Sequence, residues 1–60
     1  MPNLIKALRL KRGLTQEELA RKVNVTRTTI VFWEQGKANP KSNYIRPLAK
    51  ALRCKATDLI

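Results

Sequence analysis

The sequence has no histidine, a single cysteine and only 4 acidic residues. A zinc site needs several Cys or His ligands, and a Cys–His nucleophile pair or an internal disulfide needs residues that this chain lacks. A chain of 60 residues also forms only one small core, because a domain of this size buries about 60% of the surface that its unfolded form exposes. We therefore expect no enzyme activity, no metal site and no cofactor.

Long apolar runs are also missing from the sequence. No stretch approaches the roughly 20 residues of a membrane-spanning helix, and the N-terminus lacks the apolar segment of a signal peptide.

We expect Cys54 to be a small buried hydrophobe, which suits the reducing cytoplasm. Residues 1–60 should form one cytoplasmic domain without a membrane partner, either a whole small protein or the N-terminal part of a longer one.

Positive charge is what the sequence has in excess. It contains 13 Lys and Arg residues and carries a net charge of +9. This balance indicates an acidic polymer or surface as the partner, and nucleic acid is the leading candidate. A cationic membrane peptide is the rival, but it would form one long amphipathic helix, whereas Thr, Asn, Gly and Pro residues interrupt this sequence.

Local signals predict a helix at Gln16–Val23. Thr15 is a good N-cap, and Glu18 stands where its carboxylate can accept a hydrogen bond from the N–H of the cap. Leu19 and Val23 lie on one apolar face of this helix. The pattern is typical of a short helix that packs against a small core.

A second helix should follow after a tight turn. Asn24 tolerates the left-handed conformation that ends a helix, and Thr26 or Thr28 can cap the next one. Gly36 then stops the second helix, because glycine is free to take positive φ. Ala20 is small enough for two steeply crossing helices to approach each other there. The positions expected to face the core on the second helix are Ile30 and Trp33.

The order of these motifs resembles a known family. The runs are LTQEELA at 14–20, V-x-V-T-R-x-T-I at 23–30, W-E-x-G-K at 33–37 and LAKAL at 48–52. Together they resemble the helix-turn-helix family of Cro and the phage-type repressors, also called the Xre family, over nearly the whole chain. The resemblance implies an all-α, compact five-helix repressor-like domain in which helices 2 and 3 form the helix-turn-helix. It also implies sequence-specific binding of double-stranded DNA, usually as a homodimer, and regulation of transcription, with repression favoured.

The first and fourth helices carry weaker signals. Asn3 should cap the first helix, which buries Ile5 and Leu8 with Leu4 at the margin of the stripe. A proline inside a helix loses a hydrogen bond, so we place the regular part of the fourth helix from near Pro47 and treat residues 42–46 as a turn or a separate helical turn. The residues of this segment expected to face the core are Ile45, Leu48, Ala49 and Leu52.

The fifth helix departs from the family pattern. The family usually has Gly or Asn where this chain has Arg53, and Ser or Thr at the cap where it has Lys55. We therefore expect a poorly capped fifth helix that Leu59 and Ile60 anchor. These two residues also suit the dimer surface, which the family usually places at this end of the domain.

The second helix of the helix-turn-helix should read DNA sequence in the major groove. Arg27 can make a bidentate bond to guanine, and Thr28 offers a hydroxyl and a methyl group, with Thr26 beside it. Phe32 stands where the family normally has a polar residue, and its ring could lie against thymine methyl groups. The alternative is that Val31 and Phe32 form an apolar patch for another protein, as in an antitoxin-like or protein-interaction module with the same fold.

Phosphate contacts should come from the starts of helices and from flanking cations. By resemblance, Gln16 holds a phosphate and braces the recognition helix, and Arg9 forms an ion pair with Glu34 that fixes the first helix to the recognition helix. Further candidates for phosphate contacts are Lys37, Lys41, Arg12 and Thr29.

Overall fold

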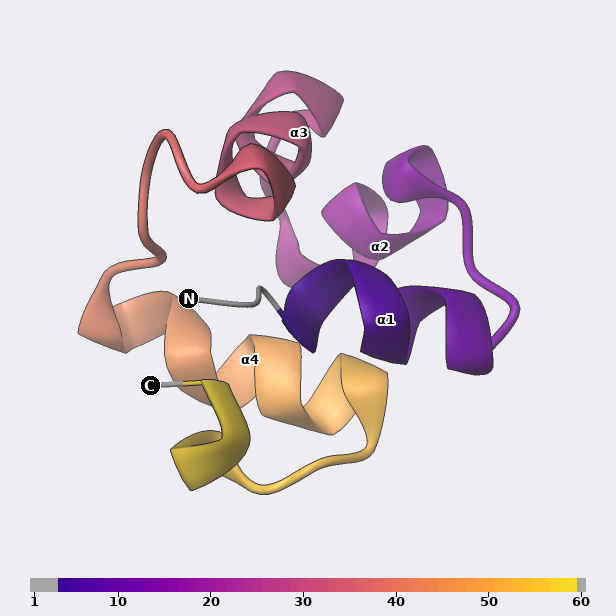
Figure 1. Cartoon of the computed structure of the whole chain (residues 1–60), viewed down its shortest axis with the longest axis vertical. Helices are drawn as coiled ribbons and strands as arrows, with labels where there is room; N and C mark the ends of the chain where they lie inside the picture. Colours follow the sequence, from indigo (N-terminus) through magenta and orange to yellow (C-terminus); the bar gives the residue numbers. More distant parts are fainter. Residues whose placement is uncertain (1–3, 60) are drawn as a thin grey trace.

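Four α-helices and one short 3-10 helix make up the computed structural model of the chain, which describes residues 4–59 (Figure 1). They are α1 (Leu4–Lys11), α2 (Gln16–Val23), α3 (Arg27–Gln35), α4 (Ser42–Leu52) and the 3-10 helix η1 (Ala56–Leu59). The described residues contain no strand. The all-α, five-helix expectation is thus confirmed, with the fifth helix reduced to a single 3-10 turn.

The capping residues define α2 as the sequence predicts. The Thr15 hydroxyl accepts a hydrogen bond from Glu18 N–H at 3.0 Å, and the Glu18 carboxylate accepts one from Thr15 N–H at 2.9 Å. This reciprocal pair satisfies backbone N–H groups that have no partner inside the helix. Asn24 ends α2 in the left-handed conformation with φ 64°.

The same kind of signals delimit α3. Thr26, and not Thr28, is the N-cap, and its hydroxyl accepts a hydrogen bond from Thr29 N–H. Gly36 ends the helix at φ 75°, a value that a side chain would make unfavourable. The turn between Asn24 and Thr26 is therefore short, and it holds α2 and α3 as a closely packed pair.

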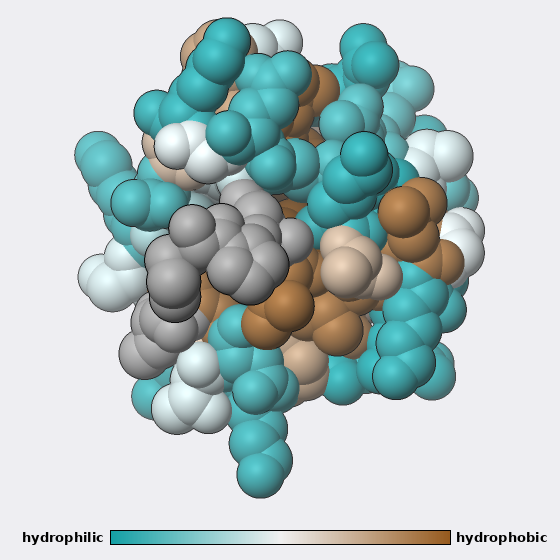
Figure 2. All heavy atoms as spheres, in the orientation of Figure 1, coloured by the Kyte–Doolittle hydropathy of each residue, from teal (hydrophilic) through white to brown (hydrophobic). Residues whose placement is uncertain are grey.

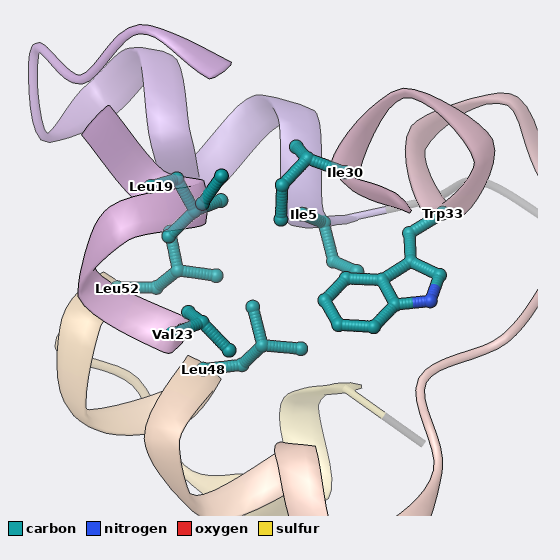
Figure 3. Packing of buried hydrophobic residues seen from close by; sticks show 8 residues of the cluster. Ile5, Leu19, Val23, Ile30, Trp33, Leu48 and Leu52 are labelled. Atoms are coloured by element: carbon teal, nitrogen blue, oxygen red, sulfur yellow. The ribbon is translucent and has the colours of Figure 1, made fainter. Parts of the chain in front are cut away.

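The core lies where α1, α2, α3 and α4 meet. Leu19, Ile30, Leu48 and Leu52 are fully buried, and their side chains point toward one another and toward Trp33 (Figure 3). Burying one such side chain stabilises the fold by about 1.5–3 kcal/mol. The further buried members of this cluster are Ile5, Ala20 and Val23.

The fourth helix differs from the sequence prediction. Pro47 lies inside α4, which already begins at Ser42 and continues to Leu52, so the expectation that the regular helix starts near Pro47, after a turn or a separate helical turn, is wrong. The missing N–H of Pro47 removes one hydrogen bond, to the carbonyl of the exposed Asn43, which water can reach. Burial of Leu48 and Leu52 outweighs that loss.

Three apolar residues lie less deeply than their patterns predict. Leu4 is 45% exposed, so it does not join the buried stripe of α1. Ile45 is half-buried and does not belong to the core cluster. Ala51, which was not expected to face the core, packs against that cluster. Cys54 is half-buried against the core. Asn3 and Ile60, expected as a cap and an anchor, lie outside the described residues.

The segment after α4 is held by side chains that bond to the backbone. Arg53 ends α4 in the left-handed conformation at φ 54°. The Asp58 carboxylate accepts a hydrogen bond from Lys55 N–H at 3.1 Å, which is one half of a capping box; the Lys55 side chain has no acceptor to supply the other half. Leu59 packs against the core cluster. The fifth helix is thus short and incompletely capped, and Leu59 anchors it, as the sequence predicts.

Candidate nucleic-acid interface

The exposed face of α3 gathers most of the candidate base-reading residues. Arg27 and Thr28 are exposed in its first turn, and Phe32 is 44% exposed. Among the described residues, no side chain bonds to the Arg27 guanidinium, so its donors are available to a ligand. Ile30 and Trp33 on the opposite face fix the rotation of the helix by their burial.

Two threonines at the start of α3 are already engaged. The Thr26 and Thr29 hydroxyls lie 3.0 Å apart and share a hydrogen bond, and Thr26 also accepts from Thr29 N–H. Thr26 serves first as the helix cap, and Thr29 is half-buried beside it. The two hydroxyls therefore serve mainly to start α3, because the hydrogen bond between them occupies one of the hydroxyl donors.

A buried ion pair ties α1 to α3. Arg9 Nε lies 2.6 Å from Glu34 Oε2, and Arg9 Nη2 lies 3.2 Å from Glu34 Oε1. The third contact of the guanidinium is to the carbonyl of Leu14 at 2.8 Å. Because Arg9 is only 7% exposed, these bonds satisfy a charge that would be unfavourable to bury alone.

Gln16 joins this pair from the first turn of α2. Its side-chain Nε2 donates to Glu34 Oε1 at 3.1 Å. One N–H of the amide is used in this bond, which leaves the second N–H for another acceptor. Glu34 thus connects α1, the start of α2 and the end of α3, and the side chain of Gln16 is held against α3 at the edge of the exposed face.

The connection from Gly36 to α4 adds two cations. Lys37 and Lys41 are exposed, and Lys41 is the N-cap position of α4 without a side-chain hydrogen bond to the helix. Figure 1 shows the start of α2, α3 and this connection along the upper edge of the molecule, with α4 and η1 below them. These three segments therefore share one side.

A family model for the helix-turn-helix matches residues 5–59. The chain belongs to this family. An uncharacterized HTH-type transcriptional regulator of Archaeoglobus fulgidus is 46% identical over 98% of this chain and 84% of its own length. Another, from Methanothermobacter thermautotrophicus, is 46% identical over 87% of this chain and 75% of its own length. The HTH-type transcriptional activator BcrR of Enterococcus faecalis is 34% identical over 93% of this chain and 28% of its own length.

Solved structures of helix-turn-helix proteins have the same fold. The P22 c2 repressor protein, crystallised in complex with a synthetic operator, matches with a TM-score of 0.92 and 30% identity over 98% of this chain and 89% of that one. The hypothetical transcription factor NHTF from Neisseria matches with a TM-score of 0.83 and 33% identity, over 92% and 62% of the two chains. The expected likeness to Cro and the phage-type repressors is confirmed.

Arg12 has a role in this helix-turn-helix domain that its sequence context does not predict. Its Nε donates to the carbonyl of Leu52 at 2.9 Å and its Nη2 to that of Arg53 at 3.2 Å. These bonds satisfy carbonyls at the end of α4 and hold that end beside the turn after α1. The side chain expected at a phosphate is thus bound to the opposite end of the molecule from α3.

Electrostatics at the start of α2 favour the charged form of Glu18. The pKa of the Glu18 carboxyl lies below its usual 4.5. The hydrogen bond from the backbone N–H of Thr15 is the largest cause, the Thr15 side chain is the next, and the cations of Arg21 and Lys22 add a smaller effect. Burial raises the pKa of the Cys54 thiol, with a smaller contribution from Asp58. Neither group lies on the exposed face of α3.

Within residues 4–59, the structure contains no group of three or more His, Cys, Asp and Glu side chains that could hold a metal ion. No helix in this part of the chain has the length and apolar character needed to cross a membrane.

On the face that Figure 2 shows, hydrophilic residues cover most of the upper half, and hydrophobic surface gathers in the middle over α1 and α4.

Proposed function

We propose that this helix-turn-helix domain binds double-stranded DNA with α3 in the major groove and thereby regulates transcription. The observation that carries the proposal is the free, outward set Arg27, Thr28 and Phe32 on a backbone that matches an operator-bound repressor with a TM-score of 0.92. An α-helix fits the major groove of B-DNA, where each base pair presents a distinct pattern of donors and acceptors. The excess of positive charge supports a polyanionic partner.

Base reading rests on the first turn of α3. The unpaired guanidinium of Arg27 can donate two parallel hydrogen bonds to guanine O6 and N7. Thr28 can bond to a base edge or place its methyl group against a thymine. The Thr26 hydroxyl already bonds to Thr29 as the cap of α3. A contact of Thr26 with a base would therefore have to form in addition to these capping bonds.

Phe32 is the candidate for apolar reading. Its ring lies on the exposed face more than one turn beyond Arg27, and 44% of its surface is accessible. Thymine methyl groups are the apolar features of the major groove. We expect Phe32 to favour A·T pairs at the positions next to those that Arg27 reads.

Phosphate contacts surround α3 on the same side of the domain. The second N–H of the Gln16 amide can donate to a phosphate while the first bonds to Glu34. Lys37 and Lys41 follow on the other side of α3, and the uncapped first turn of α4 adds backbone N–H groups. The bonds of Arg12 to α4 and of Thr29 to Thr26 make these two weaker candidates.

A homodimer is part of the proposal. One recognition helix reads too few base pairs to identify a site in a genome, and two-fold dimers place two such helices about one helical turn apart. We therefore expect two copies to bind a two-fold symmetric site. The direction of regulation is not part of the proposal, because the relatives include both a repressor and an activator.

A selection from random duplex DNA with the purified chain at moderate salt tests the proposal. We expect a two-fold symmetric motif whose half-sites contain a G·C pair and an adjacent A·T-rich step. Binding without any enrichment, and lost as salt rises, would contradict sequence-specific recognition by α3.

Two variants separate base reading from phosphate contact. Arg27→Ala should relax the preference at one base position by about 1–3 kcal/mol, with non-specific affinity changed by a few-fold or less. Gln16→Ala should weaken binding to all duplexes alike. Fluorescence anisotropy on a panel of singly substituted sites measures both effects, and a uniform loss for Arg27→Ala would reassign that residue to the phosphates.

The exposure of Phe32 also supports a second candidate, a protein-interaction module. Val31 is half-buried next to it, so the apolar patch of these two residues is small. Under this reading, Phe32→Ser would leave DNA selection unchanged and abolish binding of a protein partner. Under the DNA reading, the same substitution removes the preference for thymine at one position.

A further inference from the structure

We propose that a second basic surface, formed by α4 and the end of α2, binds an acidic segment of another protein. A shallow groove of about 660 Å³ lies there, lined by Lys22, Arg46, Pro47, Lys50, Ala51 and Arg53. We call it the α4 groove. Its lining includes none of the residues that we assign to DNA, so the inference goes beyond the proposed function.

The cations of the α4 groove are arranged in a row. Arg46, Lys50 and Arg53 follow one another at spacings of four and three residues along α4 and its C-cap. Residues at such spacings lie on one face of a helix, and seven residues of helix rise by about 10.5 Å. Lys22 faces this row from the last turn of α2.

These positive charges have little compensation inside the protein. In residues 4–59, the single ion pair joins Arg9 to Glu34, and neither residue lines the groove. Asp58 bonds to the backbone of Lys55, and Glu18 caps α2, where Lys22 contributes only weakly to the lowered pKa of its carboxyl. The α4 groove thus keeps a concentrated positive field that a partner with carboxylates would neutralise.

The floor of the α4 groove favours a polypeptide over a nucleic acid. Pro47 and Ala51 are half-buried and supply apolar surface between the cations. An acidic segment with one apolar side chain could fill this floor and place carboxylates against the row, as amphipathic helices do in grooves. A DNA backbone is polar along its length and convex, so it would leave the floor uncovered.

The position of the α4 groove allows both partners to bind at once. Figure 1 shows α4 at the lower end of the molecule and α3 at the upper end. The start of α4 lies on the side that we assign to DNA, whereas the groove is lined by residues 46–53 and by Lys22 at the end of α2. A DNA-bound domain can therefore present this surface to a second protein.

Nuclear magnetic resonance with the labelled chain tests the proposal. The probe is a synthetic helical peptide with Glu at i, i+4 and i+7 and a Leu on the same face, added at moderate salt. We expect shifts at the backbone amides of α4 and the end of α2, with those of α3 unchanged. A peptide of the same composition, with Glu spread around the helix, should bind at least about tenfold more weakly, a difference of about 1.4 kcal/mol.

Matched variants exclude a simple effect of net charge. Arg46→Glu/Lys50→Glu should lose at least about tenfold in peptide affinity, whereas Lys6→Glu/Lys11→Glu on α1, with the same change of charge, should stay within about twofold. Arg46→Ala/Lys50→Ala repeats the test without charge reversal. Loss of sequence selection by the Ala variant would place the α4 groove at the DNA and overturn the proposal.

Two further results would also overturn it. Equal binding of both peptides would mean that only overall charge attracts them. Shifts of the same α4 amides by a duplex of arbitrary sequence, with the peptide silent, would identify the groove as a DNA-backbone surface. Because the readout is peptide binding, the proposal can fail while α3 still selects DNA, and the reverse also holds.

Discussion

Arg53 is the residue whose type conflicts most with its backbone. It ends α4 at φ 54°, where a side chain is unfavourable by about 1–2 kcal/mol. The conformation persists because the backbone N–H of Arg53 bonds to the end of α4 and its carbonyl accepts from Arg12. Neither bond needs the arginine side chain.

Arg53→Gly should therefore stabilise the domain by about 0.5–1 kcal/mol. Relief of the left-handed strain exceeds the extra freedom that glycine gives to the unfolded chain. Urea denaturation measures the change in the free energy of unfolding. Lys50→Gly, inside α4, is the control and should destabilise by about 1 kcal/mol; equal effects of the two would contradict the argument.

Individual residues of the candidate site differ in how far the sequence predicts their roles. The exposure of Arg27, Thr28 and Phe32 follows from the 3.6-residue period of a helix whose other face carries Ile30 and Trp33. The bonds of Arg12 to α4 could not be predicted, because their acceptors are backbone carbonyls 40 and 41 residues away. Such acceptors leave no pattern in the local sequence.

At the scale of elements, helix ends were the predictable part of the fold. Thr15 with Glu18, Asn24 and Gly36 act within a few residues of themselves, so their sequence context is nearly sufficient. The prediction for α4 was wrong at Pro47 because it used only the local preference against proline inside a helix. It left out the burial of Leu48 and Leu52 against the core. Tertiary packing decides where local signals conflict.

The capping box of α2 makes a pH dependence expected. The folded-state pKa of Glu18 lies below its usual 4.5, so the capping contribution is fully present above that pH and is lost as the pH falls through the lowered pKa. Glu18→Gln keeps an acceptor for Thr15 N–H without a charge. The difference in Tm between the wild type and this variant should shrink as the pH falls from 6 toward 3 (roughly the titration range of carboxyl groups).

Glu17→Gln is the matched control for that experiment. It removes the same charge from the same end of α2 but leaves the hydrogen bonds of the capping box in place. Its Tm difference from the wild type should vary less with pH, because only the interaction with the helix dipole is lost. The same pH profile for both variants would show that the capping bonds do not cause the effect.

For the molecule as a whole, cations lie on two surfaces, for which we propose different partners. The side of α3 carries Arg27, Lys37 and Lys41, and the α4 groove carries the row that ends at Arg53. Both surfaces contribute to the net charge of +9. Only cations at the DNA surface should contribute to the salt dependence of DNA binding, because counterions are released where phosphates are neutralised.

Lys41→Ala tests this division. If Lys41 neutralises one phosphate, its loss should reduce the slope of log K against log salt concentration by about 0.9 for each subunit. Lys55→Ala removes the same charge from the exposed turn before η1 and should leave the slope unchanged. Anisotropy titrations of a selected duplex over a range of salt concentrations give both slopes. Equal reductions would mean that DNA responds to the overall charge of the domain, and the separation of the two basic surfaces would then have to be abandoned.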